Sequence, residues 1–212
     1  MASTAMYVQY GAGLCGPSAW VNFDVSPTLR LQRLPAVGPL FSRIGPAFPR
    51  TVRYGDIVAG LPIARESCAA IYCSHVLEHL TLVDLRTALA NTHAYLRPGG
   101  RFRLVLPDLE QLARSYIANP EAGASISFMN DSRLGEARRP RGLGGMLRSV
   151  FGHTAHLWMW DYKSLRHELE SVGFRDVRRA AFGDSGDAMF DVVEDPERWH
   201  ESLGMECFRP PA

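Results

Sequence analysis

The chain has 212 residues, of which 46% are hydrophobic; this suits one domain with a substantial core and leaves no room for a second full domain. Its 23 basic and 22 acidic side chains give a net charge of +1, so no broad positive field favours nucleic acid as a partner. The first apolar run lacks a basic segment and breaks at Gly11, which predicts no signal peptide and no membrane span, and favours a cytoplasmic location.

The first half of the chain contains a glycine turn followed by an acid. Tyr10-Gly11-Ala12-Gly13 follows a first apolar run, and Asp24 ends the second. In an open α/β sheet, such glycines allow close backbone approach and such an acid binds ribose hydroxyls. The formal dinucleotide fingerprint beginning at Gly11 ends on Gly16, which is too close to Asp24 for a crossover helix that holds a pyrophosphate. The pattern therefore favours an adenosine-type ligand without pyrophosphate.

Apolar runs alternate with helical patterns along the chain, an order typical of an α/β fold with a mainly parallel sheet and helices on both faces. The candidate strands are Tyr7–Tyr10, Val21–Phe23, Thr51–Tyr54, Ala69–Cys73, Phe102–Leu106, Asp176–Ala180 and Met205–Arg209.

Three segments have helical patterns. Leucines at helical spacing predict a helix over Leu82–Leu96, and a second helix is expected from Leu109 to about Asn119. Asp161 is a predicted N-cap for a third helix over Tyr162–Val172, with Gly173 as its stop. The proline-containing segment from Ser26 to Arg50 is expected to be irregular and to wrap an edge of the sheet.

The four cysteines predict reduced thiols. Cys15, Cys68, Cys73 and Cys207 are scattered, with no C-x-x-C pair and no histidines at metal-ligand spacing. A disulfide framework is also unusual in a chain of this length. We therefore expect no metal site.

Two later segments resemble a known family. Ala69-Ala70-Ile71-Tyr72-Cys73-Ser74-His75-Val76-Leu77-Glu78-His79-Leu80 and Leu96-Arg97-Pro98-Gly99-Gly100 resemble the strand-four and strand-five motifs of class I S-adenosylmethionine-dependent methyltransferases of the small bacterial, type 11-like kind. The resemblance implies an α/β fold with a doubly wound, seven-stranded, mostly parallel Rossmann-like sheet. It also implies a single domain over residues 1–212, a substrate lid over 124–156 after strand five, and S-adenosyl-L-methionine as the cofactor.

The resemblance also indicates which residues form the cofactor site. The glycine turn would contact the methionyl part, Asp24 the ribose, and Asp56 the adenine amino group, with Ile57 against the ring. Ordinary turns would use the same glycines and aspartates, and this alternative stays open. The full predicted set is Gly11, Ala12, Gly13, Asp24, Asp56, Ile57, Ser74 and His75.

Methyl transfer requires the acceptor to lie in line with the sulfonium, and an alcohol or ammonium acceptor must also lose a proton. A histidine suits that task, and His75, His153 and His156 are the candidates. Arg141 of the lid could bind a charged acceptor, and Trp158 and Trp160 could stack on it. Core packing for the tryptophans and plain surface roles for the others are the alternatives.

These features predict methyl transfer to an oxygen or nitrogen of a small or medium-sized acceptor, with a homodimer as an option. Cys73-Ser74-His75-Val76 stands where DNA amino-methylating relatives carry an Asn/Asp-Pro-Pro-aromatic motif, which disfavours a nucleic-acid target. Gln9 replaces the acid that usually precedes the glycine turn. A non-catalytic binding protein on the same fold and, less favoured, a nicotinamide-dependent oxidoreductase remain as alternatives.

Overall fold

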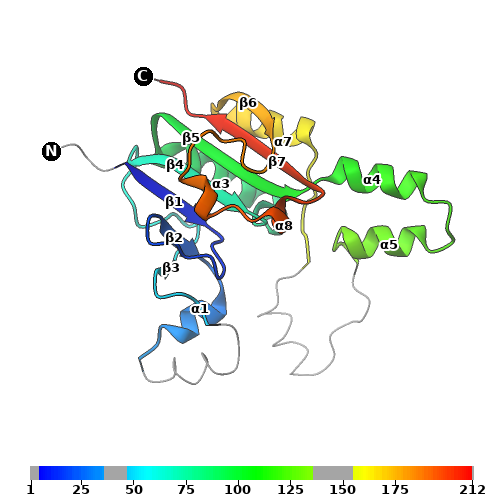
Figure 1. The fold of residues 1–212 in the computed structure, drawn as a ribbon, viewed down its shortest axis with the longest axis horizontal. Helices are drawn as coiled ribbons and strands as arrows, with labels where there is room; N and C mark the ends of the chain where they lie inside the picture. The colour runs from blue at the N-terminus through cyan, green and yellow to red at the C-terminus, as the bar shows by residue number, and fades with distance from the viewer. Residues whose placement is uncertain (1–4, 36–46, 136–154, 212) are drawn as a thin grey trace.

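A computed structural model describes residues 5–35, 47–135 and 155–211 (Figure 1). Its centre is a seven-stranded sheet in the order β3-β2-β1-β4-β5-β7-β6, parallel except for β7, which runs antiparallel to both neighbours. All seven predicted strands are confirmed, with their ends displaced by a few residues. The strands are β1 (Met6–Tyr10), β2 (Val21–Asp24), β3 (Val52–Tyr54), β4 (Cys68–Ser74), β5 (Leu96–Pro107), β6 (Arg175–Ala180) and β7 (Ser202–Phe208).

Strand β5 begins earlier than the sequence predicts. The helix before it, α3 (Leu82–Tyr95), passes directly into the strand, and the Pro98-Gly99-Gly100 segment forms an irregularity inside β5 rather than a turn before it. The register with β4 shifts across this segment, where Gly99 adopts a φ of +73°. Glycine tolerates this backbone conformation at little steric cost, so the strand continues on the far side of the bulge.

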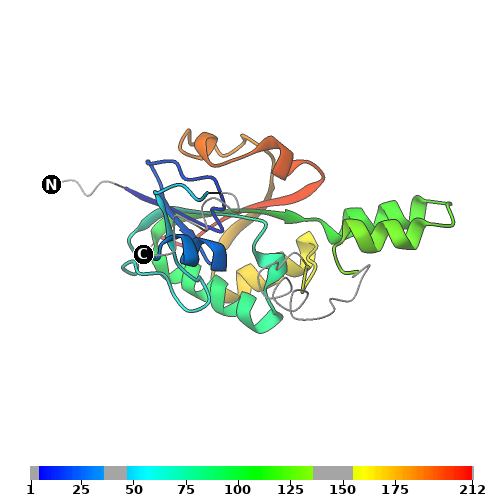
Figure 2. The ribbon, with the colours of Figure 1, turned by 90° about the horizontal axis from the view of Figure 1, so that it is seen from below.

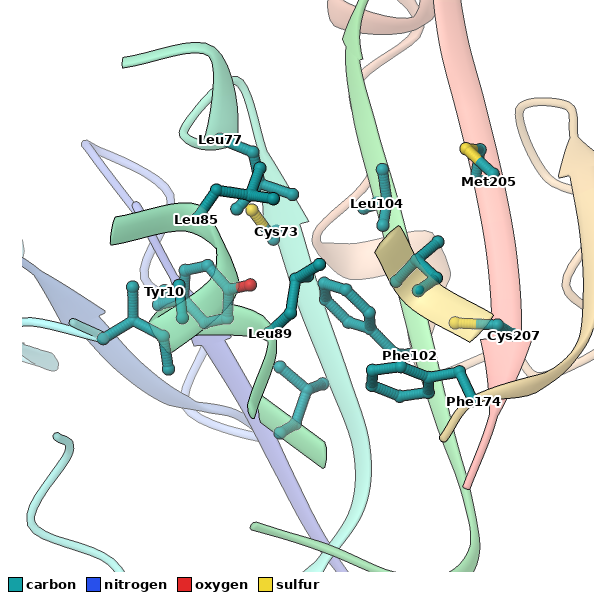
Figure 3. Packing of buried hydrophobic residues seen from close by; sticks show 14 of the residues in the cluster. Tyr10, Cys73, Leu77, Leu85, Leu89, Phe102, Leu104, Phe174, Met205 and Cys207 are labelled. Carbon is teal, nitrogen blue, oxygen red and sulfur yellow. The ribbon is translucent and has the colours of Figure 1, made fainter. Parts of the chain in front are cut away.

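One face of the sheet is covered by α3 and α7 (Tyr162–Val172), as Figure 2 shows edge-on. Alternate residues of β5 point to this face, and Phe102 packs there against Phe174 with ring centroids 5.7 Å apart. Leu89 of α3 is fully buried in the same cluster (Figure 3). Leu165 of α7 is also fully buried there. Asp161 caps α7 as predicted, because its side chain accepts a hydrogen bond from the Ser164 backbone.

Among the described residues, no long helix covers the opposite face, and the link between β1 and β2 is too short to cross back over the sheet. This face is covered by the β6–β7 connection, which includes η2 (Phe190–Val192) and α8 (Pro196–Trp199). Aromatic side chains of this connection pack on Trp20 and Tyr72, and Trp199 donates a hydrogen bond to the Tyr72 hydroxyl at 3.2 Å.

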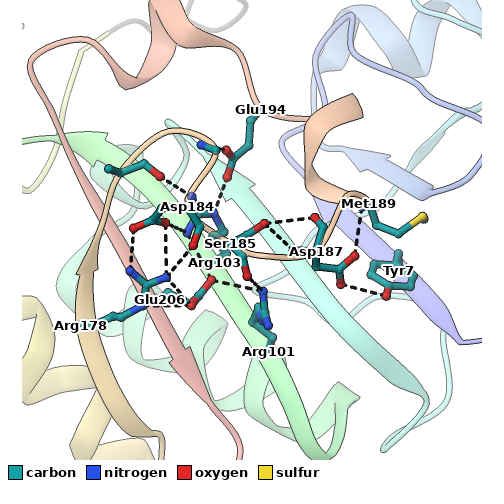
Figure 4. A network of polar contacts seen from close by, with 12 residues as sticks. Tyr7, Arg101, Arg103, Arg178, Asp184, Ser185, Asp187, Met189, Glu194 and Glu206 are labelled. Atoms are coloured by element: carbon teal, nitrogen blue, oxygen red, sulfur yellow. Dashed lines mark hydrogen bonds and ion pairs between the residues drawn. The ribbon is translucent and has the colours of Figure 1, made fainter.

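A buried ion network fixes the β6–β7 connection to the sheet (Figure 4). Arg103 of β5 is fully buried and donates to Glu194, to Asp184 at 2.8 Å and to Glu206 at 3.2 Å. Arg178 of β6 donates to the same Asp184 and Glu206. The three carboxylates come from two parts of the chain, so the network joins the connection to β5, β6 and β7.

Two other helical regions lie at the ends of the molecule. Residues Pro27–Gln32 form helix α1, where the sequence predicts an irregular segment; Pro27 starts it without penalty, because the first turn of a helix needs no backbone donor there. Helices α4 (Leu109–Ala118) and α5 (Ala124–Asp131) extend together away from the sheet (Figure 1). Within the described ranges, no helix is long and apolar enough to cross a membrane.

Candidate functional site

The strand order reverses between β1 and β4, because the chain builds β1 to β3 outward on one side and continues with β4 and β5 on the other. Ligands of open α/β sheets bind in the crevice at the carboxyl ends of the strands beside such a point. Tyr10 at the end of β1 pairs with Cys73 of β4, so Gly11, which follows β1, and Ser74, which ends β4, lie side by side. Gly11 and Ser74 therefore lie at the topological switch point.

The two glycines of the turn differ in their surroundings: Gly11 is packed against a side chain, and Gly13 faces open space. Gly11 has a φ of +69°, and a Cβ added there would lie 2.0 Å from the Val76 side chain, so only glycine fits. Gly13 has a φ of +54°, and a Cβ added to it would meet nothing within 4 Å. The backbone at Gly13 thus borders open space, as close approach of a ligand requires.

Asp24 lies at the carboxyl end of β2, half-buried, with its carboxylate held by two backbone groups. Oδ2 accepts a hydrogen bond from Gly13 N at 2.8 Å and Oδ1 from Ser26 N at 2.7 Å. Each carboxylate oxygen has two lone-pair positions, so both retain capacity for a ribose hydroxyl. The bonds fix the carboxylate beside the open backbone of Gly13.

Gln9, which replaces the acid that usually precedes the glycine turn, has a structural role. Its buried side chain donates to Asn22 Oδ1 at 2.6 Å and to the Cys15 carbonyl at 2.8 Å. These bonds tie the glycine turn to β1 and β2. The sequence gives no signal of this role, because the two acceptors are brought to Gln9 only by strand pairing and the turn.

Asp56 and Ile57 follow β3, as predicted. Asp56 Oδ1 accepts from Val58 N at 2.8 Å and so closes its own turn, and the neighbouring Gly55 N donates to the Asp24 carbonyl at 3.1 Å. Ile57 is 5% exposed and belongs to the main core cluster. Ile57 therefore anchors the turn in the core. The half-buried Asp56 lies in this turn, which the Gly55–Asp24 hydrogen bond connects to the end of β2.

Ser74 ends β4 and His75 follows it, and Arg198 of α8 contacts both. Arg198 donates to Ser74 Oγ at 2.7 Å and to the Ser74 carbonyl at 2.8 Å, while His75 Nε2 donates to the Arg198 carbonyl at 2.9 Å. His75 has a φ of +52°, an uncommon conformation that clusters at functional sites. Sequence reasoning missed Arg198, because α8 reaches this loop only through the β6–β7 connection.

A cavity of about 340 Å³ lies beside His75, between the strand ends and α4. Asp108, Arg133 and His156 also line it. Asp108 caps α4 through Glu110 N at 2.9 Å and accepts from Arg179 at 3.2 Å. The wall thus offers cationic, anionic and imidazole groups. Another cavity, of about 490 Å³, lies beside the Trp20 side chain and the start of β1, away from the switch point.

The residues predicted from the lid are only partly brought to the site. His156 is 6% exposed, and its pKa is lowered, mainly because burial disfavours the charged form. The Glu78 charge and a backbone hydrogen bond at Ser132 act in the opposite direction and raise the pKa. His153 and Arg141 lie outside the described residues. Trp160 is 2% exposed and belongs to the core, which corrects its prediction as an acceptor-facing residue; Trp158 is 43% exposed.

The sequence matches the model of a methyltransferase domain family over residues 14–179. No curated protein matches the chain. Among solved structures, an S-adenosylmethionine-dependent methyltransferase from Thermotoga maritima is similar, with 12% identity and a TM-score of 0.52 over 97% of this chain and 83% of that one.

Two further structures share the fold. The complex of the Haloferax volcanii Trm112 methyltransferase activator with a methyltransferase matches at 13% identity and a TM-score of 0.51, over 97% of this chain and 83% of that one. The carbon methyltransferase domain of a citrinin polyketide synthase matches at 14% identity and a TM-score of 0.51, over all of this chain and 48% of that one. At these identities the likeness establishes the fold alone.

Proposed function

Because the chain belongs to the methyltransferase domain family, we propose that it transfers a methyl group from S-adenosyl-L-methionine to an oxygen or nitrogen of a small or medium-sized acceptor. The observation that supports this most directly is the half-buried Asp24 carboxylate, held at the switch point beside the open backbone of Gly13. A ribose with two free hydroxyls fits such an acceptor, and charge-assisted hydrogen bonds of this kind are strong.

The residues around Asp24 fit the remaining parts of the cofactor. Ala12 and Gly13 present backbone without a large side chain to the methionyl part, and Asp56 stands after β3, on the adenine side of Asp24. Ser74 lies beside the switch point, and the next residue, His75, lines the cavity of about 340 Å³. When bound, the cofactor supplies an electrophilic methyl group; the chain has to hold the acceptor in line with it and exclude water.

The acceptor is proposed to occupy this cavity. His75 and His156 contribute polar atoms to its wall, and the Arg133 and Asp108 side chains can orient a charged or hydroxylated compound. His75 Nε2 donates to the Arg198 carbonyl, so this nitrogen is not available to take a proton from the acceptor. His75 is therefore proposed to position the loop and the acceptor, while its Nδ1 lies 3.2 Å from Glu78 Oε1.

Calorimetry with S-adenosylhomocysteine and with NAD tests the cofactor assignment. We expect the wild type to bind the homocysteine adduct and not NAD, and Asp24→Ala to lose most of this affinity, because the diol loses its acceptor. Glu121→Ala, which removes the same charge from an exposed loop, is the matched control and should bind normally. Circular dichroism must show that Asp24→Ala folds, since Asp24 also braces Gly13 and Ser26.

The results separate the alternatives. Binding of NAD in place of the homocysteine adduct would overturn the proposal in favour of an oxidoreductase. Homocysteine-adduct binding without turnover across hydroxyl and amine acceptors would point to a non-catalytic binding protein. Unchanged affinity in a folded Asp24→Ala protein would show that the cofactor does not lie at this carboxylate.

A further inference from the structure

Beside the acceptor cavity, a buried carboxylate lies without a hydrogen-bond donor. Glu78, in the short η1 helix (Leu77–His79) after β4, is fully buried, and neither of its carboxylate oxygens has a hydrogen-bond partner in the described part of the chain. The nearest imidazole nitrogens are His75 Nδ1 at 3.2 Å and His79 Nε2 at 4.0 Å from Glu78 Oε1. A buried charge without hydrogen bonds is costly, and native proteins satisfy such a group by pairing or by metal coordination.

Two imidazoles lie near this carboxylate. His79 Nδ1 lies 3.0 Å from the Ala155 carbonyl and must be the donor there, because a carbonyl only accepts, so Nε2 carries the lone pair. The Nδ1 atom of the buried His156 has no hydrogen-bond partner. Ligand atoms of Glu78, His79 and His156 lie within 4.8 Å of one another. Small side-chain rotations bring such atoms to zinc bond lengths of about 2.0–2.2 Å.

The surroundings have the features of a metal centre. The histidine ligands of metal sites usually donate their other ring N–H to a carbonyl or carboxylate, which fixes the ring, and His79 does so through Ala155. The backbone of the next segment is also fixed, because Leu157 N and Trp158 N donate to the Glu78 carbonyl at 2.7 and 3.2 Å. The second histidine is therefore held close to the first by the backbone and not by chance packing.

We propose that Glu78, His79 and His156 bind one divalent transition-metal ion, with zinc as the ion tested. Two imidazoles and one carboxylate are a ligand set of catalytic zinc sites, which keep a fourth position open. His156 also lines the acceptor cavity, so a metal held by these residues would lie beside that cavity. There the metal would polarise an acceptor oxygen and lower the pKa of its hydroxyl. This last role alone rests on the proposed methyl transfer; metal binding does not.

The sequence could not predict this site. Glu78 and His79 are adjacent, and a single neighbouring pair is common in a helical turn. The third ligand, His156, is brought to them only by the tertiary fold, so no ligand spacing is visible along the chain. The expectation of no metal rested on spacing and on the cysteines, and neither of these features reports on His156.

Zinc titration of protein stripped with EDTA tests the proposal. We expect the wild type to take up one zinc per chain by elemental analysis and calorimetry, and zinc to raise its Tm, because binding to the folded state stabilises it. His156→Ala and Glu78→Gln should weaken zinc binding at least as much as the roughly 10–100-fold loss seen when outer-shell partners are removed. His93→Gln removes a histidine outside the cluster and should bind zinc as the wild type does.

Each outcome decides the matter. Failure of the wild type to take up stoichiometric zinc would overturn the proposal and leave the His75–Glu78 contact as the partner of the carboxylate. Equal affinity in wild type and His156→Ala would place any bound zinc elsewhere. If Glu78→Gln fails to fold, His156→Ala with His93→Gln still gives the comparison. Binding of S-adenosylhomocysteine, measured separately, shows whether a failure concerns the metal or the cofactor.

Discussion

The two faces of the sheet are covered by different means. On one face, α3 and α7 bury leucines against alternate strand residues such as Phe102. On the other, the β6–β7 connection has little regular structure and is held by aromatic contacts and by Arg103 with its three carboxylates. Phe102 and Arg103 are neighbours in sequence and serve opposite faces. Local hydrophobic pattern builds the first face, and long-range charge pairing builds the second.

Arg103→Ala should have the largest effect of the changes considered. It leaves the buried Glu194 without its cation and removes one of the arginines that pair with the buried Glu206, and removal of one partner from a buried ion network costs about 3–5 kcal/mol. Urea unfolding at pH 7 measures this loss. Arg114→Ala removes an exposed arginine and should change the free energy of unfolding by less than about 0.5 kcal/mol.

The loss from Arg103→Ala should also depend on pH. Burial alone raises the pKa of Asp184, but hydrogen bonds from Arg178, the Ala181 backbone and Arg103 lower it well below its ordinary value. The stability from this lowered pKa is present above the unfolded value near 3.8 and is lost as pH falls further. The difference between wild type and Arg103→Ala should therefore shrink below about pH 4. A difference that stays constant down to pH 3 would contradict charge pairing as the basis of this face.

Leu89→Ala tests the helical face. Leu89 is fully buried between α3 and the sheet, and such truncations cost about 2–5 kcal/mol through lost burial and the cavity that remains. Because no titrating group is involved, this loss should be the same at pH 7 and pH 4. Val83→Ala, on the same helix but 71% exposed, is the control and should have little effect. A marked decrease of the Leu89→Ala effect in acid would show that the two faces are not as distinct as proposed.

The same contrast explains what the sequence could predict. The seven strands, α3 and α7 follow from hydrophobic period and capping residues, which act locally. Helix α1 was missed because its prolines suggested an irregular segment, although Pro27 stands where a helix tolerates it. The covering of the second face was not predicted, because Arg103 and Glu194 are far apart in the chain and no local pattern pairs them.

The candidate site follows the same division. Gly11, Gly13 and Asp24 lie in local patterns that report the turn and the strand end, and the structure brings them together at the switch point. Arg198, which covers Ser74 and His75, belongs to the β6–β7 connection and was missed for the same reason as the covering itself. The second face therefore supplies part of the site as well as part of the core.

Asp161→Ala should have the smallest effect, and it tests whether the helical face depends on local signals as well as packing. Asp161 accepts from Ser164 N at 2.8 Å and from Ser164 Oγ at 2.6 Å, and loss of such a cap costs about 0.5–2 kcal/mol. Asp161→Asn keeps a good capping oxygen and should recover most of this stability at pH 7. The hydrogen bonds from Ser164 lower the pKa of Asp161. The stability advantage of the wild type over Asp161→Ala should therefore be lost in acid, as the carboxylate is protonated. The stability advantage of Asp161→Asn over Asp161→Ala should persist, because the amide does not titrate. Equal stability of Ala and Asn variants in urea would show that α7 is positioned by its buried leucines alone.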